Sequence, residues 1–192
     1  MTLGENKKIA LALIEEYAPN NTYLTDDEDI ATRLNFLYAL NYQELSQNKK
    51  LIKTKVLREI TGEVGKGFDE MSMPSSLYQL RKIIALDENN NELKADYKVI
   101  GKKIYLSNQI DAKYILEYFA YPTEIKEDTD NDFTLEIDQD VQMILPYAVA
   151  SDILKVDPSS DYTAFKLEYQ RKLDSLDTRR EIPTCIVEEG VL

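Results

Sequence analysis

The chain begins with two segments in which apolar residues recur every three or four positions, the spacing of one helical face. The first covers residues 5–18, and Pro19 with the asparagines after it would end that helix. The second covers residues 28–47 and follows a predicted capping box at Thr25–Glu28, with Glu28 at the third helical position. Its predicted stripe comprises Ile30, Leu34, Leu37, Asn41 and Leu45, with Phe36 and Leu40 beside it.

After residue 50 the period shifts toward two, which is typical of strands. Residues 51–60 could extend the helix, but a strand is favoured because Ile52, Thr54 and Val56 alternate and glycines follow at Gly62, Gly65 and Gly67. Further strands are predicted over residues 77–86, 93–100, 103–106 and 113–121. The predicted hairpin turns are Asn89–Asn91 and Gly101–Lys102, since Asn and Gly tolerate positive φ.

Helical periodicity returns near the C-terminus. A helix is predicted over residues 138–156, in which Pro146 should produce a kink or delay the regular start. Asp157 and Pro158 are suited to start a second helix, as cap and first residue. Its predicted apolar stripe is Tyr162, Phe165, Tyr169, Leu173 and Leu176. After Asp177 the periodicity disappears, and an extended tail is predicted.

The order of these elements predicts an α+β fold. The expected architecture is a helical bundle formed by the N- and C-terminal helices, with an inserted antiparallel β module and an extended C-terminal tail. The expected divisions are residues 1–50 for the first helices, 51–125 for the β module, 126–176 for the C-terminal helical hairpin and 177–192 for the tail.

Composition narrows the class of protein. Hydrophobic residues make up 43% of the 192 residues and charged residues 30%, which is ordinary for a soluble globular domain. No apolar run approaches the roughly 20 residues that cross a bilayer, and residues 1–8 do not have the pattern of a signal peptide. The single cysteine, Cys185, cannot form an intrachain disulfide, so a reducing compartment is expected.

No catalytic, metal or cofactor site is predicted, so we expect a protein that is not an enzyme. The sequence has no histidine, the commonest general base and a usual zinc ligand. Asp128, Asp130 and Asp132 alternate as in a calcium loop, but Phe133 replaces the required glycine. Gly62–Gly67 lacks the spacing of a phosphate loop.

The charge balance argues against a protein that grips nucleic acid. The formal net charge is −12, whereas phosphate binding needs clustered Lys and Arg. An acidic wall is compatible with DNA sliding past without adhering. One basic cluster could contact DNA or an acidic partner, although a charged strand edge that discourages aggregation is the favoured interpretation. This cluster comprises Lys49, Lys50, Lys53, Lys55 and Arg58.

Four segments, in order over residues 25–176, resemble head–tail connector (adaptor) proteins of tailed bacteriophages. Residues 37–54 resemble their passage from long helix to strand, and Met73–Ile83 resembles an L-P-x-D-F-Y-x-L-x-x-I strand start, with Ser76 in place of the acid. Tyr118–Pro122 resembles a Y-Y-x-x-P strand end. Leu145–Ala150 resembles an L-P-Y-x-x-A helix, after which Asp157, Phe165 and Tyr169 match the turn and F-x-x-x-Y helix.

The resemblance implies a structural virion protein at the neck, assembled in the host bacterial cytoplasm. In that family a ring, usually of twelve subunits, docks on the portal protein, connects the DNA-filled head to the next neck or tail protein and lines the conduit for double-stranded DNA. It implies no membrane and no cofactor. The tail would contact the portal through Arg179, Arg180, Ile182, Ile186, Val187, Val191 and Leu192.

Two alternatives stay open. A tail-completion or stopper protein of the neck would be richer in strands and would lack the terminal helical pair. A bacterial protein-binding module unrelated to virions would remain a monomer or dimer and bind a host protein.

Overall fold

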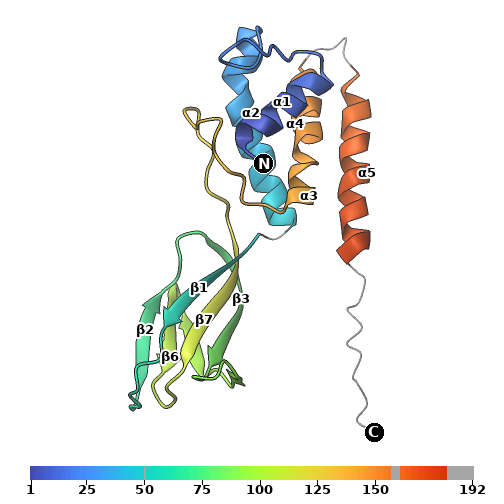
Figure 1. Cartoon of the computed structure of the whole chain (residues 1–192). Helices are drawn as coiled ribbons and strands as arrows, with labels where there is room; N and C mark the ends of the chain where they lie inside the picture. Colours follow the sequence, from blue (N-terminus) through green and yellow to red (C-terminus); the bar gives the residue numbers. More distant parts are fainter. Residues whose placement is uncertain (50, 157–160, 181–192) are drawn as a thin grey trace. The chain divides into compact units, whose positions relative to one another are not determined.

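The computed structural model describes residues 1–49, 51–156 and 161–180, with side chains through residue 176 (Figure 1). The chain divides into two compact units. The helical unit comprises Met1–Leu45 together with the residues from Glu124 onward, and the β unit comprises Ser46–Thr123. Helices and two antiparallel sheets are both present in the described residues, which confirms the prediction of an α+β fold.

The first helix, α1 (Leu3–Leu13), begins with a capping box at Thr2. The Thr2 hydroxyl accepts the Glu5 N–H at 3.2 Å, and the Glu5 carboxylate accepts the Thr2 N–H at 2.8 Å. The helix ends five residues before the predicted end at residue 18. Glu15 has a positive φ of 63°, and the Glu16 N–H donates to the Leu11 carbonyl, so the chain has already left the helix before Pro19.

The second helix, α2 (Glu28–Asn48), ends where the sequence predicted but begins with a different cap. The Asp27 carboxylate accepts the N–H groups of Asp29 and Ile30, at 2.8 and 3.0 Å. The Thr25 hydroxyl accepts the Asp27 N–H instead, so the predicted capping box at Thr25–Glu28 is wrong. Thr and Asp are both favourable N-cap residues, so residue type alone could not distinguish Thr25 from Asp27 as the cap.

The buried face of α2 differs in part from the predicted stripe. Ile30, Leu34 and Leu45 are buried as predicted. Tyr38 and Tyr42 lie between them in the core, whereas Phe36 and Leu40 are 63% and 51% exposed. The core therefore uses tyrosine rings where the sequence pattern suggested the apolar residues beside them.

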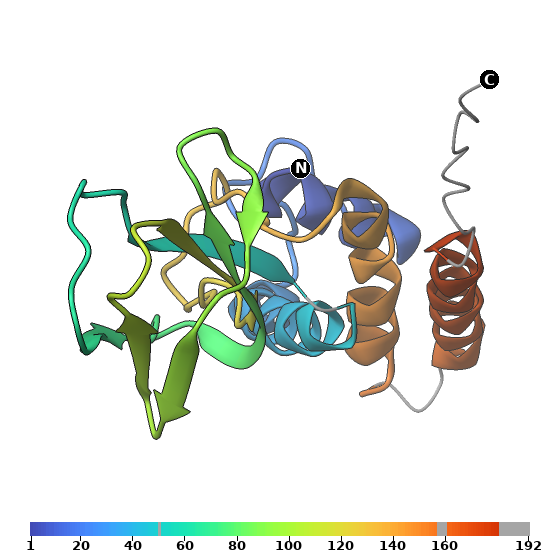
Figure 2. The same cartoon turned by 90° about the horizontal axis from the view of Figure 1, so that it is seen from below.

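The predicted helix over residues 138–156 is divided into α3 (Gln139–Gln142) and α4 (Leu145–Leu154). Pro146 lies in the first turn of α4, where its missing N–H removes no helical hydrogen bond. Of the two predicted effects of Pro146, a kink or a delayed helix start, the structure shows the delayed start. Figures 1 and 2 show α4 and the last helix, α5 (Tyr162–Arg180), running alongside one another.

The start and end of α5 also differ from the sequence predictions. Asp157 and Pro158, the predicted restart, lie outside the described residues; the Asp161 carboxylate accepts the Thr163 N–H at 3.1 Å at the observed start. The helix continues to Arg180, so the prediction of an extended segment from residue 177 is wrong for residues 177–180. Loss of apolar periodicity did not end the helix, because the helix propensities of Asp, Thr and Arg do not require an apolar face.

The core of the helical unit joins both ends of the chain. Leu3, Ala10 and Leu11 of α1 are fully buried with residues of α2 and of the segment from Ile125 onward. The N-terminal residues pair with the segment before α3, since the Leu3 N–H donates to the Phe133 carbonyl at 2.7 Å and the Gly4 N–H to the Asn131 carbonyl at 2.8 Å. A Cβ on Gly4 would lie 2.8 Å from the Asn131 Cβ, so this close approach requires glycine.

The β unit contains two antiparallel sheets, ordered β1-β7-β3-β4 and β2-β6-β5. The strands are β1 (Ile52–Arg58), β2 (Phe68–Ser72), β3 (Leu77–Leu86), β4 (Glu92–Leu93), β5 (Tyr97–Ile100), β6 (Lys103–Ser107) and β7 (Lys113–Ala120). The predicted strand over residues 93–100 is interrupted, and β2 was not predicted. Asn90 and Gly101 have φ values of 62° and 61°, which confirms the two predicted hairpin turns.

The first sheet has one face in the core of the β unit and one outer face. Tyr114, Leu116, Tyr118 and Ala120 of β7 are buried on the core face, as the alternation predicted. In β1, Ile52, Thr54 and Val56 pair with the β7 residues whose side chains lie on the outer face. The predicted alternation of β1 is confirmed, yet its apolar residues lie on the outer face.

Candidate interaction surfaces

The residues predicted to contact a partner are only partly described. Arg179 and Arg180 lie in the last turn of α5 rather than in an extended tail. The remaining five, Ile182, Ile186, Val187, Val191 and Leu192, lie outside the described residues, as does Cys185. The structure therefore brings none of these side chains into a described site.

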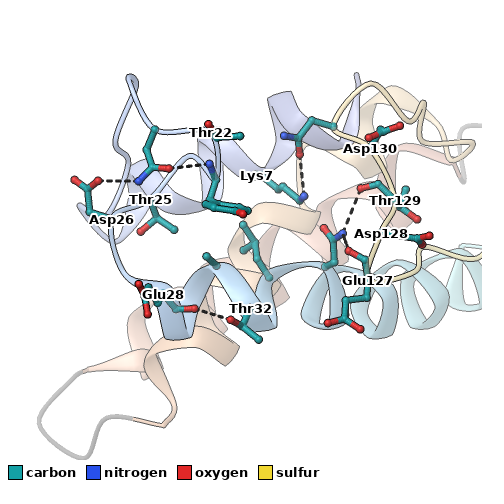
Figure 3. A pocket seen from close by; sticks show the side chains of 16 residues that line it. Lys7, Thr22, Thr25, Asp26, Glu28, Thr32, Glu127, Asp128, Thr129 and Asp130 are labelled. Atoms are coloured by element: carbon teal, nitrogen blue, oxygen red, sulfur yellow. Dashed lines mark hydrogen bonds between the residues drawn. The ribbon is translucent and has the colours of Figure 1, made fainter.

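The helical unit contains a groove with a volume of about 800 Å³ (Figure 3). Lys7 of α1 lies in it, and the lining on either side, which includes the start of α2, carries five carboxylates: Asp26, Glu28, Glu127, Asp128 and Asp130. The Lys7 side chain is buried and its Nζ donates to the Asn131 Oδ1 at 2.9 Å. Burial lowers the pKa of Lys7 to about 8, because the charged ammonium is poorly solvated there.

Asn35 of α2 fixes the acidic loop on one side of this groove. Its Nδ2 donates to the carbonyls of Lys126 and Glu127, at 3.1 and 2.7 Å. Thr129 closes the same turn by accepting the Lys126 N–H with its hydroxyl at 2.7 Å. The side chains of Asp128, Asp130 and Asp132 do not form a metal-binding group. In the described part of the chain, no three Asp, Glu or Cys side chains lie close enough together to hold a metal ion.

The outer face of the first sheet is a second candidate surface. Ile52 and Val56 are 47% and 42% exposed, and Val56 lies opposite Ile115, which in turn lies opposite Ile84 of β3. These four residues define what we call the sheet patch. Arg81 and Lys82 border it and form ion pairs with Glu117, at the centre of the same face.

The sequence contains a signal for this face that periodicity alone did not resolve. Strand β7 is apolar at nearly every position, and Ile115 and Phe119 alternate with the buried residues Tyr114, Leu116, Tyr118 and Ala120. A strand that is apolar on both faces predicts a sheet with two covered faces. The exposure of Ile52 and Val56 beside it indicates that the second face is suited to binding.

The basic cluster of β1 does not form a continuous cationic surface. Arg58 is directed into the β unit, where it donates to the carbonyls of Ser107 and Ile110 at 3.1 and 2.9 Å. Its guanidinium carbon also lies 4.6 Å from the centre of the Tyr114 ring. Lys50 lies outside the described residues, and Lys55 is exposed. Because β1 is an edge strand, Lys53 and Lys55 lie along the edge of the sheet. This position agrees with the favoured interpretation, a charged strand edge.

The backbone amides of the glycine-rich loop after β1 are hydrogen-bonded to a carboxylate of the protein itself. The Asp111 carboxylate accepts the N–H groups of Thr61 and Gly62, at 2.9 and 2.6 Å. The backbone hydrogen bond from Thr61 contributes most to lowering the pKa of Asp111. Amides that would face phosphate in a phosphate loop are thus hydrogen-bonded to a carboxylate, which agrees with a structural connection.

Charge is divided unequally between the two units. The β unit contains 13 Lys and Arg residues and 10 Asp and Glu residues, a formal net charge of +3. The rest of the chain contains 10 basic and 25 acidic residues, a formal net charge of −15. The overall charge of −12 therefore conceals an acidic helical unit joined to a weakly basic β unit.

The comparisons with known proteins leave the family open. The chain matches no known family model, and no curated protein matches it. Within the described residues, the helices are too short or too polar to span a membrane.

Proposed function

We propose that this chain is a subunit of an adaptor ring that docks on the portal of a tailed bacteriophage and joins the DNA-filled head to the tail. The observation that carries this proposal is the ordered set of four segments that resemble phage connectors. The elements on which these segments lie support it. Leu145–Ala150 begins α4, the segment ending at Ile83 leads into β3, and Tyr118–Pro122 ends β7.

In this proposal the helices from both ends of the chain form the ring body, as a bundle with the β module inserted between them. The residues from Arg179 to Leu192 bind the portal, and the next neck or tail protein binds elsewhere on the ring. The formal charge of −15 outside the β unit supports the assignment, because an acidic wall would let double-stranded DNA pass without adhering.

The proposed role is binding rather than catalysis. The sequence lacks histidine and every catalytic motif considered above. Lys7, whose pKa is lowered by burial, lies in a groove that carries five carboxylates. The protein would be made in the bacterial cytoplasm and would act in the virion neck.

Electron microscopy of the full chain mixed with the purified portal of the same virus tests the proposal. We expect a ring of about twelve subunits seated on the portal. A chain lacking residues 181–192 should bind the portal more weakly while keeping its circular dichroism spectrum, because α5 ends before that segment. If the chain forms no ring and does not bind the portal, the proposed adaptor function is wrong. Binding only to an existing portal–adaptor complex would favour a stopper, and capture of a host protein by a monomer or dimer would favour a non-viral binding module.

A further inference from the structure

Two pairs of exposed apolar side chains lie on different units. Phe36 and Leu40, one turn apart on α2, are 63% and 51% exposed; we call them the helix patch. The sheet patch contains Ile52 and Val56, 47% and 42% exposed. Each pair lies on a regular element with well-defined neighbours, so neither is a mobile loop tip. Contiguous apolar surface of this kind commonly marks a site of protein contact.

The surroundings of the helix patch are acidic. Along the same side of α2, the exposed residues include Asp29 and Glu44, and Glu28 lies at the N-terminal end. Arg33 pairs with Asp29 at 2.8 Å and compensates one of these charges. The whole unit carries a formal charge of −15, so two helix patches facing each other would bring like charges together.

The surroundings of the sheet patch are basic. Arg81 and Lys82 lie on the same face and share one acidic partner, Glu117, so the face keeps one excess positive charge. The β unit as a whole also carries a formal net charge of +3. Both patches are therefore apolar at the centre, with acidic residues around the helix patch and basic residues around the sheet patch. Such charge complementarity favours contact between unlike patches over contact between like ones.

We propose that the helix patch of one copy binds the sheet patch of a second copy. Because the two surfaces differ, the contact is head to tail: an open chain of copies keeps one unused helix patch at one end and one unused sheet patch at the other, and it grows until it closes. Closure into a ring rests on the proposed adaptor function, but the contact itself does not. The Phe36 and Leu40 side chains would cover the apolar row formed by Ile52, Val56 and Ile115.

Two single variants test this contact because each blocks only one patch. Phe36→Glu removes the helix patch and keeps a good helix former, and Val56→Glu removes the sheet patch at an exposed strand position. In sedimentation experiments we expect the wild-type chain to form oligomers larger than a dimer as concentration rises. Each variant alone should remain monomeric, with self-association weakened at least tenfold. An equimolar mixture should form a dimer and nothing larger, because one intact patch remains on each variant.

Matched controls carry the same substitution at exposed apolar positions outside both patches. Leu167→Glu on α5 and Ile100→Glu on β5 alter residues that are 65% and 63% exposed, and both variants should assemble as the wild type does. Circular dichroism and thermal melting of all four variants check that the fold is kept.

Several results would overturn the contact. A wild-type chain that stays monomeric up to about 1 mM has no self-contact of useful strength. Assembly of either patch variant like the wild type would remove its patch from the interface, and a mixture that stays monomeric would exclude head-to-tail pairing. Failure of the adaptor function is seen separately, as normal self-assembly without binding to portal.

Discussion

The helical unit and the β unit are constructed in opposite ways. The β unit is one uninterrupted stretch, Ser46–Thr123, whose strands pair with neighbours inside that stretch. The helical unit combines residues from both ends of the chain, and its N-terminal residues hydrogen-bond to residues 131–142. An inserted unit of this kind can fold from its own sequence, whereas the unit that receives it needs both flanking segments. We therefore expect the two units to respond differently to the same kind of damage.

The largest difference is expected on removing residues 1–13. This deletion removes Leu3 and Leu11, both fully buried, with a loss of about 1.5–3 kcal/mol for each side chain before its hydrogen bonds are counted. Such a loss is comparable with the whole stability of a small domain. The helical unit should unfold while the β unit stays folded, seen as dispersed amide resonances for residues 46–123 alone.

A truncation of similar length at the other end is the control. Removing residues 181–192 should preserve the resonances of both units, since α5 ends at Arg180. If the deletion of residues 1–13 instead unfolded both units together, the separation into an inserted and a receiving unit would be wrong in energetic terms.

Within the β unit, Arg58→Ala should have the largest effect of any single basic-residue substitution. The Arg58 side chain is 11% exposed and donates to Asn108 Oδ1 at 2.7 Å as well as to the two carbonyls described above. Its loss leaves those buried acceptors without a donor, so we expect a decrease of about 3 kcal/mol in the free energy of unfolding. Urea denaturation should show the change only in the transition of the β unit.

Arg81→Ala is the matched control for Arg58→Ala. Arg81 pairs with a carboxylate, Glu117, but its side chain is 47% exposed, and exposed ion pairs contribute less than about 1 kcal/mol. Equal effects of the two substitutions would show that the buried hydrogen bonds of Arg58 do not determine the stability of this unit.

The contrast between Arg58 and Arg81 also shows the limit of sequence reasoning. Arg58 belongs by sequence to a basic cluster, and only the pairing of β1 with β7 places it beside residues 107–110, some fifty positions later. Periodicity predicted most helices and strands and the two hairpin turns, because these depend on neighbouring residues. It could not decide which face of β1 packs inward, since β7 is apolar on both faces, nor that Phe36 and Leu40 are exposed while Tyr38 and Tyr42 are buried. The short, polar strand β2 had no recognisable pattern at all.

Lys7 should make the stability of the helical unit depend on pH. Its folded-state pKa of about 8 lies below the ordinary lysine value of 10.5, so the unfolded chain binds the proton more tightly between these values. The free energy of unfolding should therefore rise as the pH increases through this range. Between pH 7 and pH 9.5 the wild type should gain about 2 kcal/mol relative to Lys7→Met, measured by urea denaturation.

Lys8→Met is the control, because Lys8 is the adjacent residue of α1 but is exposed. Groups that titrate equally in all three proteins cancel from the comparison. A gain that is the same for the Lys7 and Lys8 variants would mean that burial of Lys7 does not control its protonation.

The smallest predicted effect compares two buried tyrosines, four residues apart on α2. The Tyr42 hydroxyl accepts the Glu136 N–H at 2.7 Å, and burial raises the pKa of Tyr42 to about 12. The Tyr38 hydroxyl is fully buried and has no hydrogen-bond partner among the described residues. Tyr42→Phe should therefore lower the free energy of unfolding by about 1 kcal/mol, whereas Tyr38→Phe should leave it unchanged or raise it by up to about 1 kcal/mol.

Thermal and urea denaturation of both Phe variants measures this difference, and the ring is retained in each, so packing is matched. The sign for Tyr38 is informative because an unpaired buried hydroxyl costs stability that phenylalanine does not. A loss at Tyr38 as large as that at Tyr42 would show that the Tyr38 hydroxyl is hydrogen-bonded in solution.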